Sequence, residues 1–106
     1  MPDQLLTDDE LQRVLKALAD PNRRHMLELL AVQETVCTST ATAGVNCSMI
    51  AGQLPIAQPT VSHHVKELVH AELVAMTPVG TSSLLSLRRD TLDALFATLR
   101  ERLHLP

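Results

Sequence analysis

Aromatic residues are nearly absent from the sequence: Phe96 stands alone, and there is no tryptophan or tyrosine. The core is therefore expected to be aliphatic, and proteins that stack single-stranded bases on aromatic side chains are disfavoured. The chain also lacks an apolar run long enough to span a membrane, and because its N-terminal segment is acidic we do not expect a secretory signal. We expect a cytoplasmic protein that forms one domain over residues 1–106.

Cysteine is scarce as well, since Cys37 and Cys47 are the only two. In the reducing cytoplasm they are expected to be free thiols, which react or bind metals if they are functional. The sequence shows no phosphate-binding glycine loop, no carboxylate pair and no nucleophile placed with a base and an acidic group. We therefore predict that the protein is not an enzyme and assign no catalytic residue.

Basic residues do not outnumber acidic ones, which is unusual for a DNA-binding protein. The formal net charge is −3, from 9 Lys and Arg against 12 Asp and Glu. Four of the 12 acidic residues lie in the first ten positions, which contain no Lys or Arg, so the remainder has 8 acidic against 9 basic residues. This distribution is compatible with a basic face but does not demonstrate one.

The first third of the chain is predicted to form two helices. Thr7 followed by Glu10 is a capping-box signature, and Asp20 before Pro21 is typical of a second helix start. The apolar stripe expected on the first helix comprises Leu11, Val14, Leu15 and Leu18. In the second helix, the residues expected to face inward are Met26, Leu27 and Leu30.

The middle of the chain alternates between irregular and regular patterns. Residues 34–46 are small, polar or β-branched, and we interpret them as a loop with a short strand near Val45. A short third helix is predicted to end at Leu54, because a proline follows. A tight connection then leads to a fourth helix over 58–72.

Two stretches rich in Val, Thr and Leu, 73–79 and 83–88, predict a β-hairpin. The last helix is predicted from an apolar stripe of Leu92, Leu95, Phe96, Leu99 and Leu103. A short helix joined tightly to a longer one is the helix-turn-helix pattern, and the hairpin supplies a wing. The predicted fold is mainly α with a small β-hairpin (α+β): a winged helix-turn-helix of five helices.

The fourth helix is predicted to have one apolar and one polar face. Its apolar face comprises Val61, Val65, Leu68 and Val69. Its other side and flanks carry Pro59, Thr60, Ser62, His63, His64, Lys66, Glu67 and His70. Short polar side chains of this kind bond base edges and phosphates, and Gln58 at the helix start suits pairing with adenine. The alternative is a helix face that is merely solvated.

Two segments resemble ArsR/SmtB-type repressors. Residues 17–27 (ALADPNRRHML) resemble the motif that leads into the family's second helix, and residues 58–68 (QPTVSHHVKEL) resemble its recognition helix. Leu73-Val74 matches the apolar pair that opens the wing. The resemblance implies a homodimeric transcriptional repressor that binds double-stranded, inverted-repeat operator DNA and is released by a ligand or a chemical modification.

The resemblance also implies roles for individual residues. It assigns base reading to Gln58, Thr60, Ser62 and His63, and phosphate contact to Lys66. The wing tip would lie near the DNA backbone, although it lacks the Arg or Lys common in the family. The DNA-binding residues predicted in total are Gln58, Pro59, Thr60, Ser62, His63, His64, Lys66, Thr81 and Ser82.

The apolar stripes of the first and last helices predict a homodimer. Left uncovered, each would form a large exposed apolar patch of a kind that is rare in monomers. Pairing these helices across a two-fold axis buries the stripes and sets two recognition helices one DNA turn apart, ~34 Å. The alternative is that the two helices pack on each other within one chain.

Cys37 and Cys47 are the candidate sensing residues. Thiolates bind arsenite, copper(I) or zinc and react with oxidants or persulfides. The one cofactor that the sequence suggests is a metal or metalloid ion bound by these two cysteines. The sequence departs from the family here, because Asn46-Cys47-Ser48 stands where the family's metal sensors have two cysteines separated by one residue.

Other interpretations of the same sequence stay open. Cys47 fits a small buried apolar position and Cys37 an incidental loop position. The repressor fold could then sense an organic molecule without using either thiol. A third alternative is a winged-helix module that binds proteins rather than DNA, which the acidic net charge favours.

Overall fold

The computed structural model describes residues 5–36, 45–46, 58–79 and 82–106. Its elements are α1 (Asp8–Leu18), α2 (Pro21–Val36), β1 (Val45–Asn46), α4 (Gln58–His70), β2 (Val74–Val79), β3 (Ser82–Leu87) and α5 (Arg89–Arg102). Four of the five predicted helices are thus confirmed, and the third, ending at Leu54, lies outside the described residues. Within the described part, no helix has the length and apolar character needed to cross a membrane.

The capping box predicted at the start of α1 is present. The Thr7 hydroxyl accepts the Glu10 backbone N–H at 3.2 Å, and the Thr7 N–H donates to the Glu10 carboxylate at 2.9 Å. These bonds satisfy two backbone groups that the helix itself leaves unpaired. The backbone hydrogen bond from Thr7 lowers the pKa of Glu10, so this carboxylate stays ionised near neutral pH.

The turn between α1 and α2 caps both helices. Asp20 Oδ1 accepts the backbone N–H groups of Asn22 at 2.8 Å and Arg23 at 3.2 Å, which confirms the predicted helix start. In return, Arg23 Nε donates to the Ala17 carbonyl at 2.8 Å, and Arg24 donates to the Leu18 carbonyl at 2.6 Å. Positive charges at a helix C-terminus interact favourably with the helix dipole. These bonds also tie the start of α2 to the end of α1 and so fix the angle between the two helices.

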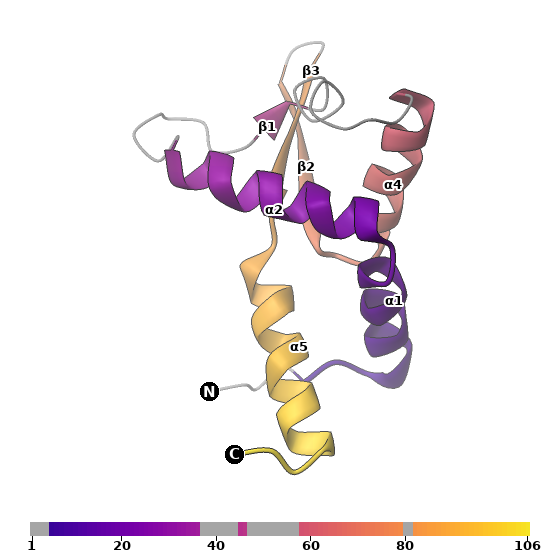
Figure 1. Cartoon of the computed structure of the whole chain (residues 1–106), viewed down its shortest axis with the longest axis vertical. Coiled ribbons are helices and arrows are strands. Elements are labelled where there is room, and N and C mark those ends of the chain that lie inside the picture. The colour runs from indigo at the N-terminus through magenta and orange to yellow at the C-terminus, as the bar shows by residue number, and fades with distance from the viewer. Residues whose placement is uncertain (1–4, 37–44, 47–57, 80–81) are drawn as a thin grey trace.

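The core is aliphatic, as the composition predicted. Figure 1 shows α2 crossing the middle of the molecule, with α5 reaching away from the β2–β3 hairpin. Helix α2 packs against α1, α4 and β3. The buried apolar residues are Val14, Ala17, Met26, Leu27, Leu30, Val61, Val65, Leu68, Ala71, Leu73, Val74, Leu85 and Leu95.

Strands β2 and β3 form the predicted antiparallel hairpin. Their register runs from Val74 opposite Leu87 to Val79 opposite Ser82. The short strand expected near Val45 is present as β1, which pairs with β3 through Val45 opposite Leu85. The sheet order is therefore β1-β3-β2, and β3 is its central strand.

Candidate DNA-binding surface

Helix α4 presents one buried and one exposed face, as its sequence predicted. Val61, Val65 and Leu68 are buried in the core. The exposed residues of the helix are Pro59, Thr60, Ser62, His63, Lys66 and His70. The polar face of α4 therefore projects outward, and its apolar face is fixed against the rest of the fold.

His64 differs from the other polar residues of α4 in being buried. Its side chain is only 6% exposed, and its Nδ1 lies 3.3 Å from Arg23 Nη1. Because a guanidinium only donates, Nδ1 is the acceptor in this hydrogen bond. His64 therefore packs against α2 through Arg23, and the DNA contact assigned to its side chain stays a prediction.

Arg23 links α4 to α1 through this histidine. Besides His64, its guanidinium bonds the carbonyl oxygens of Ala17 and Lys16. Partial burial of Asp20 acts to raise its pKa, but hydrogen bonds from the N–H groups of Arg23 and Asn22, with the charges nearby, hold that pKa below its ordinary value. An ionised Asp20 thus stays beside the Arg23 guanidinium, which holds His64.

Sequence reasoning missed this anchoring role of Asp20 and Arg23, which it interpreted only as a helix start. The adjacent pair His63 and His64 could have indicated that one of the two histidines is buried. Neighbouring residues on a helix diverge by about 100°, so two of them rarely face the same surface. The two rings are tilted by 52° with centroids 5.9 Å apart, and only His63 is exposed.

The end of α4 sets the direction of the hairpin. Glu72 has a positive φ of 62° and donates its N–H to the Val69 carbonyl, while Leu73 donates to the Leu68 carbonyl at 3.0 Å. This pair of bonds is a Schellman motif, which ends a helix with a residue in the left-handed region. The chain turns sharply there and enters β2 beside α4.

For some of the predicted site residues, the structure gives only the backbone position or no description. Gln58 is the first residue of α4 and Ser82 the first of β3, as backbone positions. Thr81, Cys37 and Cys47 lie outside the described residues, so the proposed sensing site stays a prediction. In the parts of the chain that are described, no three His, Cys, Asp or Glu residues gather where they could hold a metal ion.

Comparison with known proteins adds to this geometry. A family model described as a helix-turn-helix domain matches residues 18–77. An arsenical resistance operon repressor of Staphylococcus xylosus is 36% identical over 84 residues, which cover 79% of this chain and 71% of that protein. The chain belongs to the ArsR family of winged helix-turn-helix regulators.

Solved structures of ArsR-type proteins share the fold. An ArsR-like transcriptional regulator from Rhodococcus sp. RHA1 is 26% identical with a TM-score of 0.71, covering 91% of this chain and 80% of that one. A homodimeric winged helix-turn-helix DNA-binding domain from Mycobacterium bovis is 24% identical with a TM-score of 0.65, covering 99% of this chain and 94% of that one. This ArsR-family chain is accordingly a DNA-binding transcriptional regulator and not an enzyme.

Proposed function

We propose that this ArsR-family protein is a homodimeric repressor that inserts α4 into the major groove of an inverted-repeat operator. Thr60, Ser62 and His63 read base edges, and Lys66 contacts a phosphate. The observation that carries the proposal is the division of α4 into an exposed polar face and a buried apolar one. A recognition helix needs both, because its contacts with bases depend on a fixed orientation in the groove.

The exposed apolar residues of the terminal helices support the homodimer. Leu15 on α1 is 42% exposed, Phe96 on α5 is 53% exposed, and Leu103, just after α5, is 61% exposed. Burying such residues against a second copy stabilises a dimer by about 25 cal/mol for each Å² of apolar surface removed from water. The homodimeric Mycobacterium bovis relative supports the same assembly.

Titration of labelled promoter DNA from this chain's own gene tests operator binding. Thr60→Ala and Ser62→Ala are each expected to cost about 1 kcal/mol or more of operator affinity, since a hydrogen bond to a base edge contributes that much. Lys66→Ala is expected to lower the salt slope of binding by about 1, because the variant neutralises one phosphate fewer. Lys16→Ala is the matched control, because Lys16 is an exposed lysine on α1. Unchanged affinity in all three α4 variants would contradict the proposal.

We further propose that a thiophilic inducer releases the repressor by reacting at Cys37 and Cys47. The name of the Staphylococcus xylosus relative makes trivalent arsenic the first inducer to test. Each thiol would displace one hydroxyl group from arsenous acid, forming an arsenic–sulfur bond and releasing water. Cys47 lies 11 residues before the start of α4, so a crosslink there is placed to affect the orientation of the helix.

Serine substitutions at the two cysteines test the inducer. Arsenite is expected to release wild-type protein from labelled operator and to leave the double variant Cys37→Ser, Cys47→Ser bound. The same release assay is repeated with peroxide and with persulfide in place of arsenite, on the wild type and the double variant. Release that persists in the double variant would exclude thiol sensing and favour an organic inducer.

A further inference from the structure

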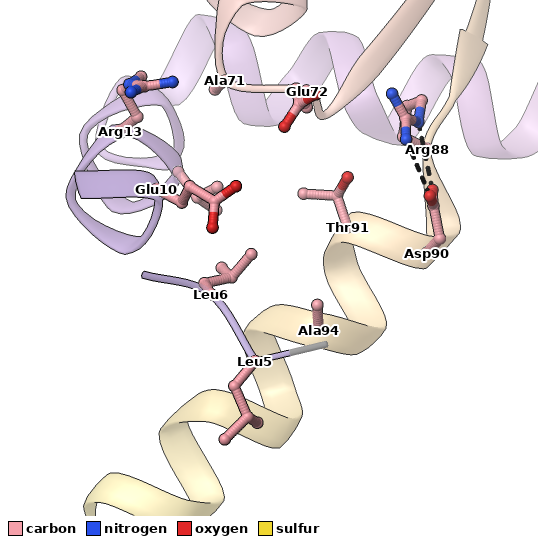
Figure 2. A pocket seen from close by; sticks show the side chains of 11 residues that line it. Leu5, Leu6, Glu10, Arg13, Ala71, Glu72, Arg88, Asp90, Thr91 and Ala94 are labelled. Atoms are coloured by element: carbon pink, nitrogen blue, oxygen red, sulfur yellow. Dashed lines mark hydrogen bonds and ion pairs between the residues drawn. The ribbon is translucent and has the colours of Figure 1, made fainter. Parts of the chain in front are cut away.

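The hydrogen bonds that involve charged side chains differ in how they respond to pH. Figure 2 shows the ion pair of Arg88 and Asp90, with 2.9 Å between Nη2 and Oδ2, and the hydrogen bond from Arg88 lowers the pKa of Asp90. Glu10, which lines the same open pocket, is held by Thr7, and its pKa is lowered as well. Carboxylates and guanidinium groups of this kind keep their charges from about pH 5 to about pH 8.

The contact between Arg23 on α2 and His64 on α4 depends on a proton. Its acceptor, His64 Nδ1, lies 3.3 Å from Arg23 Nη1. Both nitrogens of an imidazolium are donors, so a protonated ring cannot accept this hydrogen bond. Imidazole is the side chain that ordinarily changes its charge between about pH 5 and about pH 8. The contact therefore exists only while His64 is neutral.

His64 is the buried member of the five histidines, all of which lie in the described residues. Its side chain is 6% exposed. The four exposed histidines are His25, His63, His70 and His104. Water solvates a positive charge on an exposed ring, whereas a charge on a buried ring must be accommodated by the protein. A change in the charge of His64 is therefore felt where α4 packs against α2.

Two charged side chains face His64 from outside its own helix. Arg23 repels a protonated ring, and its guanidinium is also held by two carbonyl oxygens at the end of α1. Asp20 attracts a protonated ring, but its Oδ1 already accepts two backbone N–H groups at the start of α2. Lys16 on α1 shares the guanidinium through its carbonyl oxygen, and its side chain is exposed. The group in direct contact with the ring is therefore the cation.

The other elements around His64 add little charge. Strand β2, which also packs against α4, has the sequence VAMTPV and contains no titratable side chain. On α4 itself, the centroid of the exposed His63 ring lies 5.9 Å from that of His64. Glu67 follows one helical turn later and is partly exposed, so its charge is screened by water.

We propose that His64 is a proton-sensitive positioning residue for the recognition helix. While the ring is neutral, Nδ1 accepts the hydrogen bond from Arg23 and α4 is held against α2. Uptake of a proton at Nδ1 removes the acceptor and places two positive groups side by side, so the contact breaks and α4 loses its fixed orientation. The loss of operator affinity that follows rests on the proposed function, whereas the breaking of the contact does not.

The direction of the pH effect separates positioning from direct contact with DNA. A histidine that touches DNA increases the affinity when it is protonated, because a positive charge near phosphates is favourable. The net charge of −3, counted with neutral histidines, also becomes less negative as the pH falls, which again favours DNA binding. A positioning role for His64 predicts the opposite result, a decrease in operator affinity at lower pH.

Titration of the labelled promoter DNA at about pH 8 and about pH 5.5, at constant salt, tests the proposal. Wild-type protein is expected to bind at least about fivefold more weakly at the lower pH, because a hydrogen bond from a charged group is lost. His64→Asn keeps an acceptor oxygen on Cγ that does not titrate, so its affinity is expected to change by less than about twofold. His25→Asn, the same substitution at an exposed site on α2, should retain the wild-type decrease.

Long-range proton–nitrogen NMR spectra of the full chain without DNA observe the ring directly. His64 is expected to show an unprotonated Nδ1 at about pH 8 and protons on both nitrogens at about pH 5.5. The backbone amide signals of α4 should shift over the same pH range in the wild type and remain unshifted in His64→Asn. Circular dichroism at both pH values checks that each protein is folded.

Three results would overturn the proposal. They are wild-type promoter binding that does not weaken at the lower pH, equal weakening in the wild type and His64→Asn, and a His64 ring that stays neutral in the folded protein down to about pH 5.5. Absence of promoter binding at both pH values would instead overturn the repressor function. The NMR spectra would then still decide whether protonation breaks the contact with Arg23.

Discussion

Two adjacent histidines on α4 have opposite surroundings. His63 is exposed on the polar face, while His64 is buried and bonded to Arg23. Periodicity placed His64 on the flank of the helix, where either environment was compatible with the pattern. The contact with Arg23 joins residues 41 positions apart in the chain, and no local pattern reports such a contact.

Alanine substitutions at these histidines are expected to separate stability from DNA binding. His64→Ala should lower the free energy of unfolding by about 2 kcal/mol, because it leaves a cavity and removes one of the hydrogen bonds of the Arg23 guanidinium. His63→Ala should change stability by less than about 0.5 kcal/mol, as exposed substitutions usually do, and should weaken operator binding. Urea denaturation and operator titration of both variants provide the check; equal destabilisation by both would argue against the buried contact.

At the scale of elements, the helix starts were predictable because their signals are local. The capping box of Thr7 and Glu10 and the cap formed by Asp20 each depend on residues within one helical turn. The amphipathic pattern of α4 and the hairpin could be predicted for the same reason. The pairing of β1 with β3 rather than β2 could not, because the order of strands depends on contacts between distant segments.

The Asp20 cap predicts a pH dependence of stability. Its pKa in the folded protein lies below the ordinary value of 3.8, so its contribution is complete above the unfolded-state pKa and is lost as pH falls through the folded-state pKa. Asp20→Asn keeps an acceptor for the helix N–H groups but does not titrate. Urea denaturation between pH 7 and pH 3 should show a shallower loss of stability for this variant than for the wild type.

A second comparison at this position measures the cap itself. Asp20→Ala removes the acceptor for two backbone N–H groups and should cost about 1 kcal/mol at pH 7. Identical denaturation curves for the alanine and asparagine variants at that pH would show that the cap contributes nothing.

At the scale of the whole molecule, the exposed apolar residues of α1 and α5 suggest that one chain is half of the functional unit. Phe96→Glu places a charge in the proposed interface and is expected to give monomers in sedimentation equilibrium, because burying an unpaired charge is costly. Operator affinity should fall in parallel, since only a dimer reaches two successive major grooves.

Val32→Glu is the matched control for this prediction. Val32 lies on α2 and is 61% exposed, slightly more than Phe96 at 53%. The same substitution there should leave the protein dimeric and able to bind DNA. A wild-type protein that sediments as a monomer, or a Phe96→Glu variant that stays dimeric, would contradict the proposed assembly.

The sequence by itself determined the helix starts, the two faces of α4 and the hairpin, because each depends on side chains within a few positions of one another. Only the tertiary structure decided that His64 turns inward to Arg23 and that β1 pairs with β3. Those outcomes depend on which segments meet in space, since burial and hydrogen-bond partners are supplied by residues that lie far apart along the chain.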